Sequence, residues 1–314
     1  MTTLGDLDED LEKLGLPVPT APPESSARFA DGLRYRVEIP STEGPVALRA
    51  VIEEADARGV PLRRVSQGSG VMMLSDAEVA EMAALGAERS MEVSLFVGPR
   101  AAWETGGQAM VSGVSAGVVR GADGLAWCVA EARRAVRLGI RSLLVADVGL
   151  LGVLAEMRDA GDLPPNLLLK VSVLMPVANP AAARTMERLG AGTLNVTTDL
   201  SPVQLGELRQ ATTLPLDVYV EVPDDQGGFV RWYEVPAMIR ACAPMYVKLG
   251  LRNAPNIYPV GGHLSAAAEA LSRERVRRAE LVLRLLGEIA PELVEGWGDP
   301  APADLAIPEP GAST

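Results

Sequence analysis

The sequence predicts a single (β/α)₈ barrel, and three observations lead to that fold class. From Tyr35 onward, strand-like apolar runs alternate with amphipathic helical stretches, which is typical of parallel strands joined by crossover helices. Eight such units occupy roughly 260 residues, which lies within the size range of this barrel. The first strand, YRVEIPS, is not followed by a GxGxxG turn, so the alternative of an open doubly wound sheet is disfavoured.

The eight units follow one another along residues 35–294, which form the barrel domain. In the first half, the expected strand–helix pairs are YRVEIPS with PVALRAVIEEADARG, LRRVSQG with SDAEVAEMAALGAERS, MEVSLFVG with DGLAWCVAEARRAVRLG, and RSLLVAD with VGLLGVLAEMRDAG. In the second half they are LLLKVSVLMP with NPAAARTMERLG, TLNVTT with SPVQLGELRQATT, LDVYVEV with WYEVPAMIRAC, and MYVKLGL with SAAAEALSRERVRRAELVLRLLGEIA. Ser75 with Glu78 predicts a capping box, and Asn179 before Pro180 predicts a helix N-cap.

Residues 1–34 and 295–314 lie outside the repeating pattern. The first segment has a short helical stripe of leucines followed by PVPTAPPESS, so we expect an extension that packs outside the barrel or stays loose. The second, EGWGDPAPADLAIPEPGAST, is rich in Pro, Gly and Ala, which predicts a disordered tail. A long connection follows the third strand, and its Arg100, Trp103 and Glu104 are expected to lie over the barrel mouth.

The composition indicates a cytoplasmic protein whose partner is a small molecule. The start, MTTLGDLDEDLEKLG, lacks the regions of a secretory signal, and no apolar run reaches the length of a membrane span. The net charge of −12 disfavours a nucleic-acid partner, because binding phosphates requires basic surface. Cys128 and Cys242 are isolated from each other, so neither an iron–sulfur cluster nor a structural zinc site is expected. A homo-oligomer is left open.

Six predicted strands carry polar residues on the face opposite their aliphatic residues. Successive side chains of a strand point to opposite faces, so the aliphatic face meets the helices and the polar face meets the barrel interior. The residues expected inside are Glu38, Glu92, Lys170, Asn195, Glu221 and Lys248. Charges in such an interior are costly unless they are paired or used. We therefore expect function there, with two alternatives: ion pairs that only fill the barrel, or a face assignment shifted by one residue.

The candidate catalytic residues are Glu38, Lys170, Glu221 and Lys248, because they fall in the middle or late parts of their strands. In a closed barrel Lys248 is expected between Glu221 and Glu38, and two carboxylates would keep it protonated. Lys170 is expected to have neutral neighbours such as Asn195, so burial would lower its pKa and suit it to act as a base or Schiff-base amine. Glu38 and Glu221 are also the candidate ligands for Mg²⁺ or Mn²⁺.

Loops at the same end of the barrel supply candidate substrate-binding groups. SQGSG follows the second strand, and its backbone N–H groups could bind an anion. RNAPNIYPVGGHLS follows the eighth strand and leads into the last helix, where this fold often binds anions. The candidate substrate-binding residues are Ser66, Gln67, Asn195, Arg252, Asn253 and His263.

Several strings in the sequence resemble a known family. They are YRVEIPS, RVSQGSGVMML, KVSVLMPVANP, GAGTLNVTTDLS, PLDVYVEVPD and YVKLGLRNAPNIYP, and they are similar to the collagenase-like peptidase family U32, in a short branch of actinobacterial type. The resemblance covers about Tyr35 to Leu286 and implies a barrel fold and a hydrolase activity. Relatives that use an iron–sulfur cluster carry a set of cysteines that this chain lacks. That chemistry is therefore not carried over, and neither is any catalytic residue.

Three functions remain open at this point. The first is an enzyme that abstracts a proton beside a carbonyl group of a small carboxylate- or carbonyl-containing substrate, as lyases, aldolases and isomerases do. The second is the peptidase or amide hydrolase that the family resemblance implies, with water activated by a carboxylate or a metal. The third is a binding protein without catalysis, which would use the long last helix as an interface.

Overall fold

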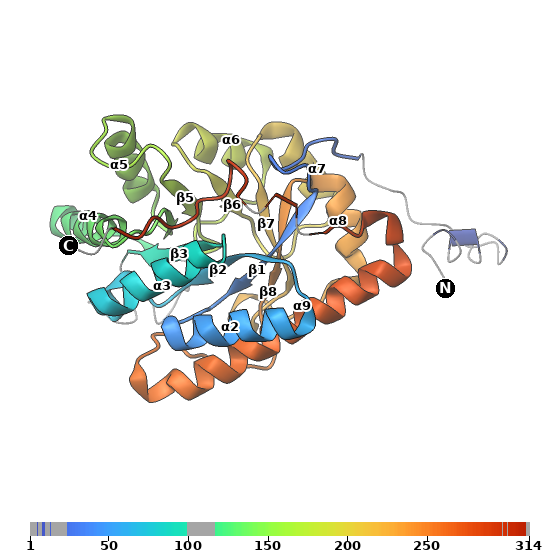
Figure 1. The fold of residues 1–314 in the computed structure, drawn as a ribbon. Helices are drawn as coiled ribbons and strands as arrows, with labels where there is room; N and C mark the ends of the chain where they lie inside the picture. The colour runs from blue at the N-terminus through green and yellow to red at the C-terminus, as the bar shows by residue number, and fades with distance from the viewer. Residues whose placement is uncertain are drawn as a thin grey trace.

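The computed structural model describes residues 5, 8, 9, 13, 24–98, 117–296, 298–299 and 301–311 of the 314-residue chain. Within these residues, eight parallel strands form one closed barrel in which β8 pairs with β1, so the predicted fold class is confirmed (Figure 1). The strands are β1 (Tyr35–Pro40), β2 (Leu62–Gln67), β3 (Glu92–Val97), β4 (Ser142–Val145), β5 (Leu168–Val171), β6 (Thr193–Asn195), β7 (Leu216–Glu221) and β8 (Met245–Leu249). The N-terminal leucines, Arg100, Trp103 and Glu104 lie outside the described residues.

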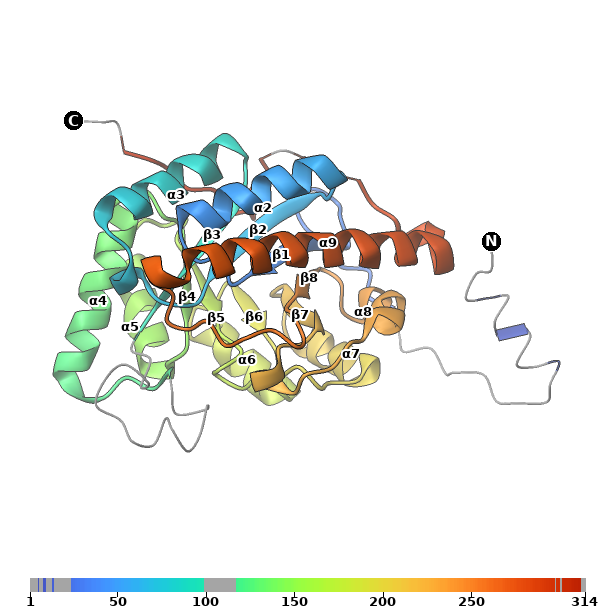
Figure 2. The same cartoon turned by 90° about the horizontal axis from the view of Figure 1, so that it is seen from below.

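A helix follows each strand and covers the outside of the barrel (Figures 1 and 2). The helices are α2 (Pro45–Arg58), α3 (Asp76–Glu88), α4 (Gly121–Arg137), α5 (Val148–Asp159), α6 (Pro180–Arg188), α7 (Pro202–Ala211), α8 (Val235–Cys242) and α9 (Ser265–Ile289). Helix α9 lies alongside α2 in both views. The predicted caps are present, because Ser75 and Glu78 form the capping box of α3 and Asn179 accepts a hydrogen bond from the backbone of Ala182.

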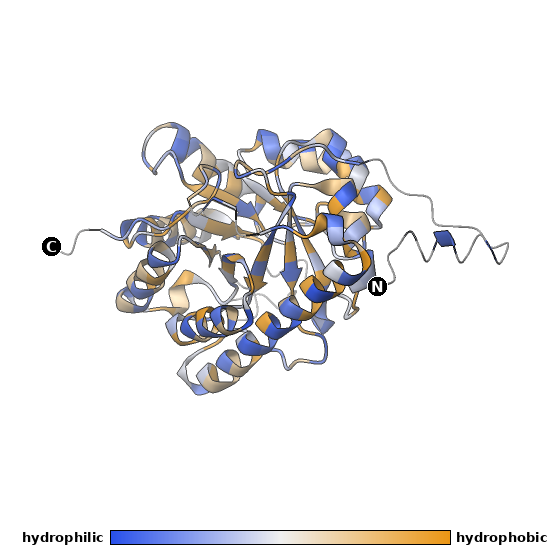
Figure 3. Cartoon of the chain, turned by 45° about the vertical axis from the view of Figure 1, so that its right-hand side comes forward, coloured by the Kyte–Doolittle hydropathy of each residue, from blue (hydrophilic) through white to orange (hydrophobic). Residues whose placement is uncertain are grey.

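The strand walls separate an aliphatic shell from a polar interior. Outward residues such as Val37, Leu95 and Val171 are fully buried between the strands and the helices, in one continuous apolar core. Burying a side chain of this size contributes about 1.5–3 kcal/mol, so this shell is the main source of stability. Figure 3 shows hydrophilic residues on the central strands as well as on the surface helices. Among the helices of the described ranges, not one combines the length and apolarity that crossing a bilayer requires.

Strand β7 departs from strict alternation near its C-terminal end. Tyr219 pairs with Lys248, but the residue that pairs with Leu249 is Glu221 and not Val220. Such a bulge sets two residues opposite one and reverses the facing of the residues after it. Leu249 belongs to the outer apolar core, so Glu221 faces outward with it. The prediction that Glu221 enters the barrel interior is therefore wrong.

The segments on either side of the barrel close its N-terminal end together. The Phe29 ring meets the Tyr246 ring edge-on at 5.1 Å between centroids, and the Arg36 guanidinium lies 4.0 Å above the Phe29 ring. Arg36 also pairs with Asp31 at 2.9 Å and with Asp304 at 2.8 Å, one from each flanking segment. A buried arginine early in β1 therefore links the two segments that flank the barrel in sequence.

The described part of the tail, residues 301–311, differs from the predicted disorder. Leu305 and Ala306 are buried, and the Glu309 carboxylate pairs with Arg141 at 2.9 Å and accepts a hydrogen bond from Asn166 at 2.7 Å. Figure 1 shows this segment, in dark red, crossing the barrel toward α4. The average composition of the tail concealed a short apolar run, LAIP, that is long enough to pack against the barrel.

Candidate active site

A network of charged side chains fills the lower and middle parts of the barrel interior, with Arg64 at its centre. The Arg64 guanidinium donates to Glu92 at 3.0 Å and to Asp217 at 3.0 Å, and lies 3.5 Å from Glu38. It also stacks 3.5 Å above the ring of Tyr246. All four charged side chains are fully buried. Arg64 is not among the residues predicted inside, although the outward Val65 beside it implies that position.

Lys170 joins the same network from the opposite wall. Its ammonium group donates to Glu38 at 2.8 Å and to Asp217, which also accepts from Thr193 at 3.1 Å. Burial is the largest influence on Lys170 and lowers its pKa, while the two carboxylates oppose that shift. The direction of this pKa shift agrees with the sequence prediction, but the predicted neutral surroundings are wrong. The neighbours were misjudged because strand order says nothing of residues that meet across the barrel.

Glu38 connects this network to the open end of the barrel. Its carboxylate contacts Lys170 at 2.8 Å and Lys248 at 3.2 Å, and accepts a hydrogen bond from Ser66 at 2.8 Å. Burial alone would raise the pKa of Glu38, but Lys170, Lys248 and Arg64 outweigh it and hold that pKa well below its ordinary value. Glu38 is therefore a permanently charged anchor for two ammonium groups.

Lys248 is the charged residue at the floor of the barrel mouth. Its ammonium group has Glu38 on one side and lies 4.3 Å above the Tyr219 ring on another. The amide oxygen of Asn195 accepts from it at 2.9 Å when that amide is oriented to satisfy both of its ends. Lys248 lines a cavity of about 50 Å³, whereas Lys170 does not. The predicted position of Lys248 between two carboxylates is half correct, because only Glu38 is there.

The walls of the mouth cavity come from the C-terminal ends of the strands and the loops that follow. The polar part of this lining includes Ser41, Ser66, Gln67, Ser172, Asn195, Tyr219, Asp225 and Tyr258, and the apolar part is formed by Pro40, Leu144, Val173 and Leu174. A hydrogen bond joins the hydroxyl groups of Ser41 and Tyr258 across the opening. The Tyr258 ring also lies so close to Gly68 that a Cβ atom there would come within 2.8 Å of it. A larger residue at position 68 would displace this ring.

The loop after β2 uses its polar groups internally. The Gln67 amide bonds to the backbone N–H and carbonyl of Gly70 at 3.0 and 3.1 Å. The backbone N–H groups of Gly68 and Ser69 donate to the Glu43 carboxylate at 2.7 and 3.0 Å. The expectation that these N–H groups bind an external anion is therefore not supported, since an internal carboxylate occupies them.

Glu221 lies outside the barrel wall, away from Glu38. It accepts a hydrogen bond from the backbone N–H of Arg252 at 3.1 Å and lies 3.7 Å from the Arg278 guanidinium on α9. Burial raises its pKa, and these two groups only partly offset the shift. Glu38 and Glu221 do not converge on one position, so the predicted Mg²⁺ or Mn²⁺ pair is wrong. Nor do three or more His, Cys, Asp or Glu side chains elsewhere in the described ranges form a metal-binding group.

The remaining predicted binding residues lie at the rim or beyond it. The Arg252 side chain pairs with Asp224 at 3.4 Å, and the Asn253 backbone donates to the same carboxylate at 2.6 Å. These contacts tie the loop after β8 to the short helix η4 (Asp224–Gln226). His263 lies in the exposed turn η6 (Gly262–Leu264) and does not line the mouth cavity.

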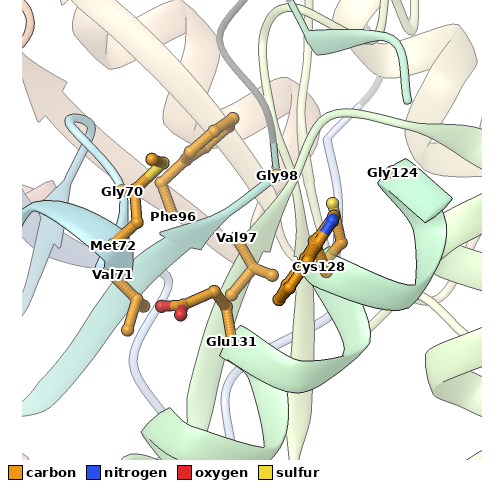
Figure 4. A pocket seen from close by; sticks show the side chains of 10 residues that line it. Gly70, Val71, Met72, Phe96, Val97, Gly98, Gly124, Cys128 and Glu131 are labelled. Carbon is orange, nitrogen blue, oxygen red and sulfur yellow. The ribbon is translucent and has the colours of Figure 1, made fainter. Parts of the chain in front are cut away.

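A separate pocket of about 180 Å³ lies between the end of β3 and helix α4 (Figure 4). Figure 4 shows Phe96 and Val97 from β3, with Cys128 and Glu131 from α4 around it. Among the described residues that line it, the charged one is Glu131, which pairs with Arg134 at 3.2 Å. Most of the described lining of this pocket is apolar.

Comparisons with known proteins add similarity of structure but no family. No family model matches the chain, and no curated protein matches it in sequence. The U32 peptidase Mk0906 is similar over 76% of this chain and 98% of its own, with 17% identity and a TM-score of 0.43. A putative lyase/mutase from Burkholderia cenocepacia is similar over 82% of this chain and 84% of its own, with 13% identity and a TM-score of 0.44.

A third similar structure is the carboxyl transferase domain of Rhizobium etli pyruvate carboxylase. It has 14% identity and a TM-score of 0.45, and the match spans 88% of this chain but 49% of the other. At such identities the likeness concerns the course of the chain and assigns neither family nor activity. The U32 resemblance therefore stays a prediction from the sequence.

Proposed function

We propose that the protein is an enzyme that binds a small carboxylate- or carbonyl-containing substrate in the barrel mouth. In this proposal the Lys248 ammonium stabilises negative charge on a substrate oxygen. One observation carries it: within the described residues, Lys248 reaches the mouth cavity and has a single carboxylate partner, at 3.2 Å. Arg64 and Lys170, deeper in the interior, contact three and two carboxylates, respectively.

The reaction class that best fits this arrangement is proton abstraction beside a carbonyl group, as in lyases, aldolases and isomerases. An ammonium held in a fixed position stabilises the enolate oxygen that forms when the neighbouring carbon loses a proton. Glu38 and the Asn195 amide oxygen hold the ammonium, so a substrate oxygen would take the N–H that otherwise faces the Tyr219 ring. Side chains able to exchange protons line the same cavity, namely Tyr219, Asp225 and Tyr258.

The size of the cavity favours a small substrate over the peptidase alternative. The mouth cavity measures about 50 Å³. One water molecule needs about 10–15 Å³ of such volume, so the cavity has room for a few waters, or for a carbonyl or carboxylate group with its neighbouring atoms. A peptide would have to leave most of its backbone outside this cavity.

A calorimetric titration with a panel of 2-oxo acids and dicarboxylates tests the proposal. We expect at least one compound to bind the wild type, and Lys248→Met to weaken that binding at least tenfold, or about 1.4 kcal/mol. Lys13→Met is the matched control, since its ammonium is exposed, and should leave binding unchanged. The bound compound should also exchange its α-hydrogen with deuterated water in an enzyme-dependent manner. Equal affinities for Lys248→Met and wild type would reject the proposal.

A further inference from the structure

A second buried cation lies beside the barrel mouth and was not predicted from the sequence. Arg275, on α9, is 5% exposed and lines a cavity of about 280 Å³. This cavity adjoins the mouth cavity, because the same side chains line both. The shared residues are Ser41, Tyr219, Asp225, Gln226 and Tyr258.

The Arg275 guanidinium is poorly satisfied by the protein. It donates one hydrogen bond, to the Ser41 carbonyl, at 3.4 Å, and its buried Nε has no partner. Among the described residues no carboxylate lies within 4.0 Å of its nitrogens, although Glu43 and Glu221 act on it from farther away. Burial lowers its pKa, so the folded protein bears a cost for keeping this charge.

By contrast, the neighbouring arginines of α9 form ion pairs. Arg273 pairs with Glu53 at 2.8 Å and with Glu269 at 3.1 Å, and Arg278 pairs with Glu274 at 2.6 Å. These pairs are partly exposed and belong to the helix surface. The helix thus supplies acidic partners to the arginines that face solvent and none at close range to Arg275, which faces the cavity.

The other walls of this cavity are partly apolar and partly acidic, which limits the negative charge that a ligand there can carry. Leu251, Pro255 and Ile257 contribute apolar surface, and Tyr219 and Tyr258 line both this cavity and the cavity that Lys248 lines. The cavity is also lined by Asp224 and Asp225. Two nearby carboxylates disfavour a dianionic phosphate more than a monoanionic carboxylate, because repulsion grows with the charge of the ligand.

We propose that Arg275 is a substrate-binding residue that holds a carboxylate of the substrate, while Lys248 faces a carbonyl or second carboxylate in the adjoining cavity. The substrate class is then an oxo acid or dicarboxylate with its two polar ends on different carbon atoms. A guanidinium matches a carboxylate with two parallel N–H groups, which fixes orientation as well as charge. This inference deepens the proposed function and rests on it for the role of Lys248, but binding at Arg275 stands independently.

Titration of the full chain with succinate, glutarate, their monoamides and inorganic phosphate tests this assignment. We expect wild type to bind a dicarboxylate more tightly than its monoamide. Arg275→Gln should lose at least tenfold in dicarboxylate affinity and abolish the preference, while Arg275→Lys should restore part of it. Arg273→Gln is the matched control on the same helix and should bind as wild type does. Circular dichroism and the thermal midpoint confirm that each variant is folded.

Each result separates this inference from the proposed function. Loss of binding in Arg275→Gln with normal binding in Lys248→Met would uphold the carboxylate site and reject the proposed role of Lys248. Equal dicarboxylate affinity in Arg275→Gln and wild type would overturn the inference, and so would absence of carboxylate binding to wild type. Tighter binding of phosphate than of any carboxylate, lost in Arg275→Gln, would overturn the choice of ligand. If Arg275→Gln does not fold, the dicarboxylate affinity of Arg275→Lys is compared with that of wild type instead, and equal affinities would overturn the inference.

Discussion

The cations in the lower interior of the barrel differ from those at its mouth in how many carboxylates they contact. In the lower interior, Arg36, Arg64 and Lys170 each contact at least two carboxylates at hydrogen-bonding range. At the mouth, Lys248 has one such partner, and Arg275 has none within 4.0 Å among the described residues. A saturated network fixes the barrel walls, whereas under-satisfied cations beside a cavity are what an anionic ligand would complete.

Glu38→Gln is expected to cause the largest loss of unfolding free energy among the variants that test this difference. The substitution leaves Lys248 without a carboxylate and removes one of the two partners of Lys170. Removing one member of a buried ionic network costs about 3–5 kcal/mol, because the remaining charge stays buried. Urea unfolding should show a loss of this size at neutral pH.

Glu221→Gln is the matched control, since Glu221 is equally buried and also lies on a strand. Its pKa is raised, so burial disfavours its charge and the neutral amide should be tolerated or slightly stabilising. A loss from Glu221→Gln as large as that from Glu38→Gln would show that both carboxylates are structural anchors and that the division between lower interior and mouth is wrong.

The second largest effect is expected on the pH dependence of stability, to which Glu38 and Glu221 should contribute with opposite sign. The pKa of Glu38 is lowered from an ordinary value near 4.5, so below that pH the unfolded chain takes up a proton before the folded one. Stability from Glu38 is therefore present above about pH 4.5 and lost as the pH falls, by about 1.4 kcal/mol per unit for one proton. Urea unfolding between pH 3.5 and 7 should show this loss, and Glu38→Gln should flatten it.

Glu221 contributes with the reverse sign. Its pKa is raised above 4.5, so between that value and the folded pKa the folded chain holds the extra proton. Stability from this group is present at low pH and lost as the pH rises through the folded pKa. The stability of Glu221→Gln relative to wild type should therefore increase as the pH rises from 4.5. A stability difference between the two proteins that does not change with pH would contradict the raised pKa of Glu221.

The fold could be predicted because its signal is repeated along the whole chain. Alternating runs of apolar residues indicated eight units, and the polar positions between the outward aliphatic residues correctly placed Glu38, Lys170, Asn195 and Lys248 inside. Glu221 is the interior candidate that was placed wrongly, because it follows a bulge in β7. A bulge shifts the strand register without a characteristic residue type, so the alternation of apolar and polar residues does not reveal it. Position on a face is thus predictable only as far as the pairing stays regular.

The partners within the site could not be predicted in the same way. Lys170 meets Glu38 and Asp217, which belong to strands that are not its neighbours in the barrel order. Such contacts depend on the stagger of the closed sheet and on side-chain length, and neither is read from one strand. Arg275 was missed for a different reason, since one more arginine in a helix rich in Arg and Glu has no distinguishing pattern.

Asp304→Asn is expected to have a smaller effect than either change in the network. Its carboxylate is one of two partners of Arg36 and is 33% exposed, while Asp31 would remain at 2.9 Å. A partly exposed pair of this kind contributes about 0.5–1 kcal/mol. The thermal midpoint should fall slightly, and Glu288→Gln, at an exposed surface pair, should not change it. No effect from Asp304→Asn would mean that the contact with Arg36 does not contribute to holding the tail.

Lys248→Met is expected to change stability no more than Asp304→Asn does, and it is the most informative test of the difference between lower interior and mouth. Without Lys248, Glu38 keeps Lys170 at 2.8 Å, Arg64 at 3.5 Å and the Ser66 hydroxyl at 2.8 Å, so no buried charge is left uncompensated. The change in unfolding free energy should stay within about 1 kcal/mol, since a methionine fills similar volume without a charge to bury. The same variant should lose ligand binding, and this combination distinguishes a binding cation from a structural one. If Lys248→Met destabilised the barrel as strongly as Glu38→Gln, Lys248 would belong to the structural network, and the mouth would keep Arg275 as its one candidate binding cation among the described residues.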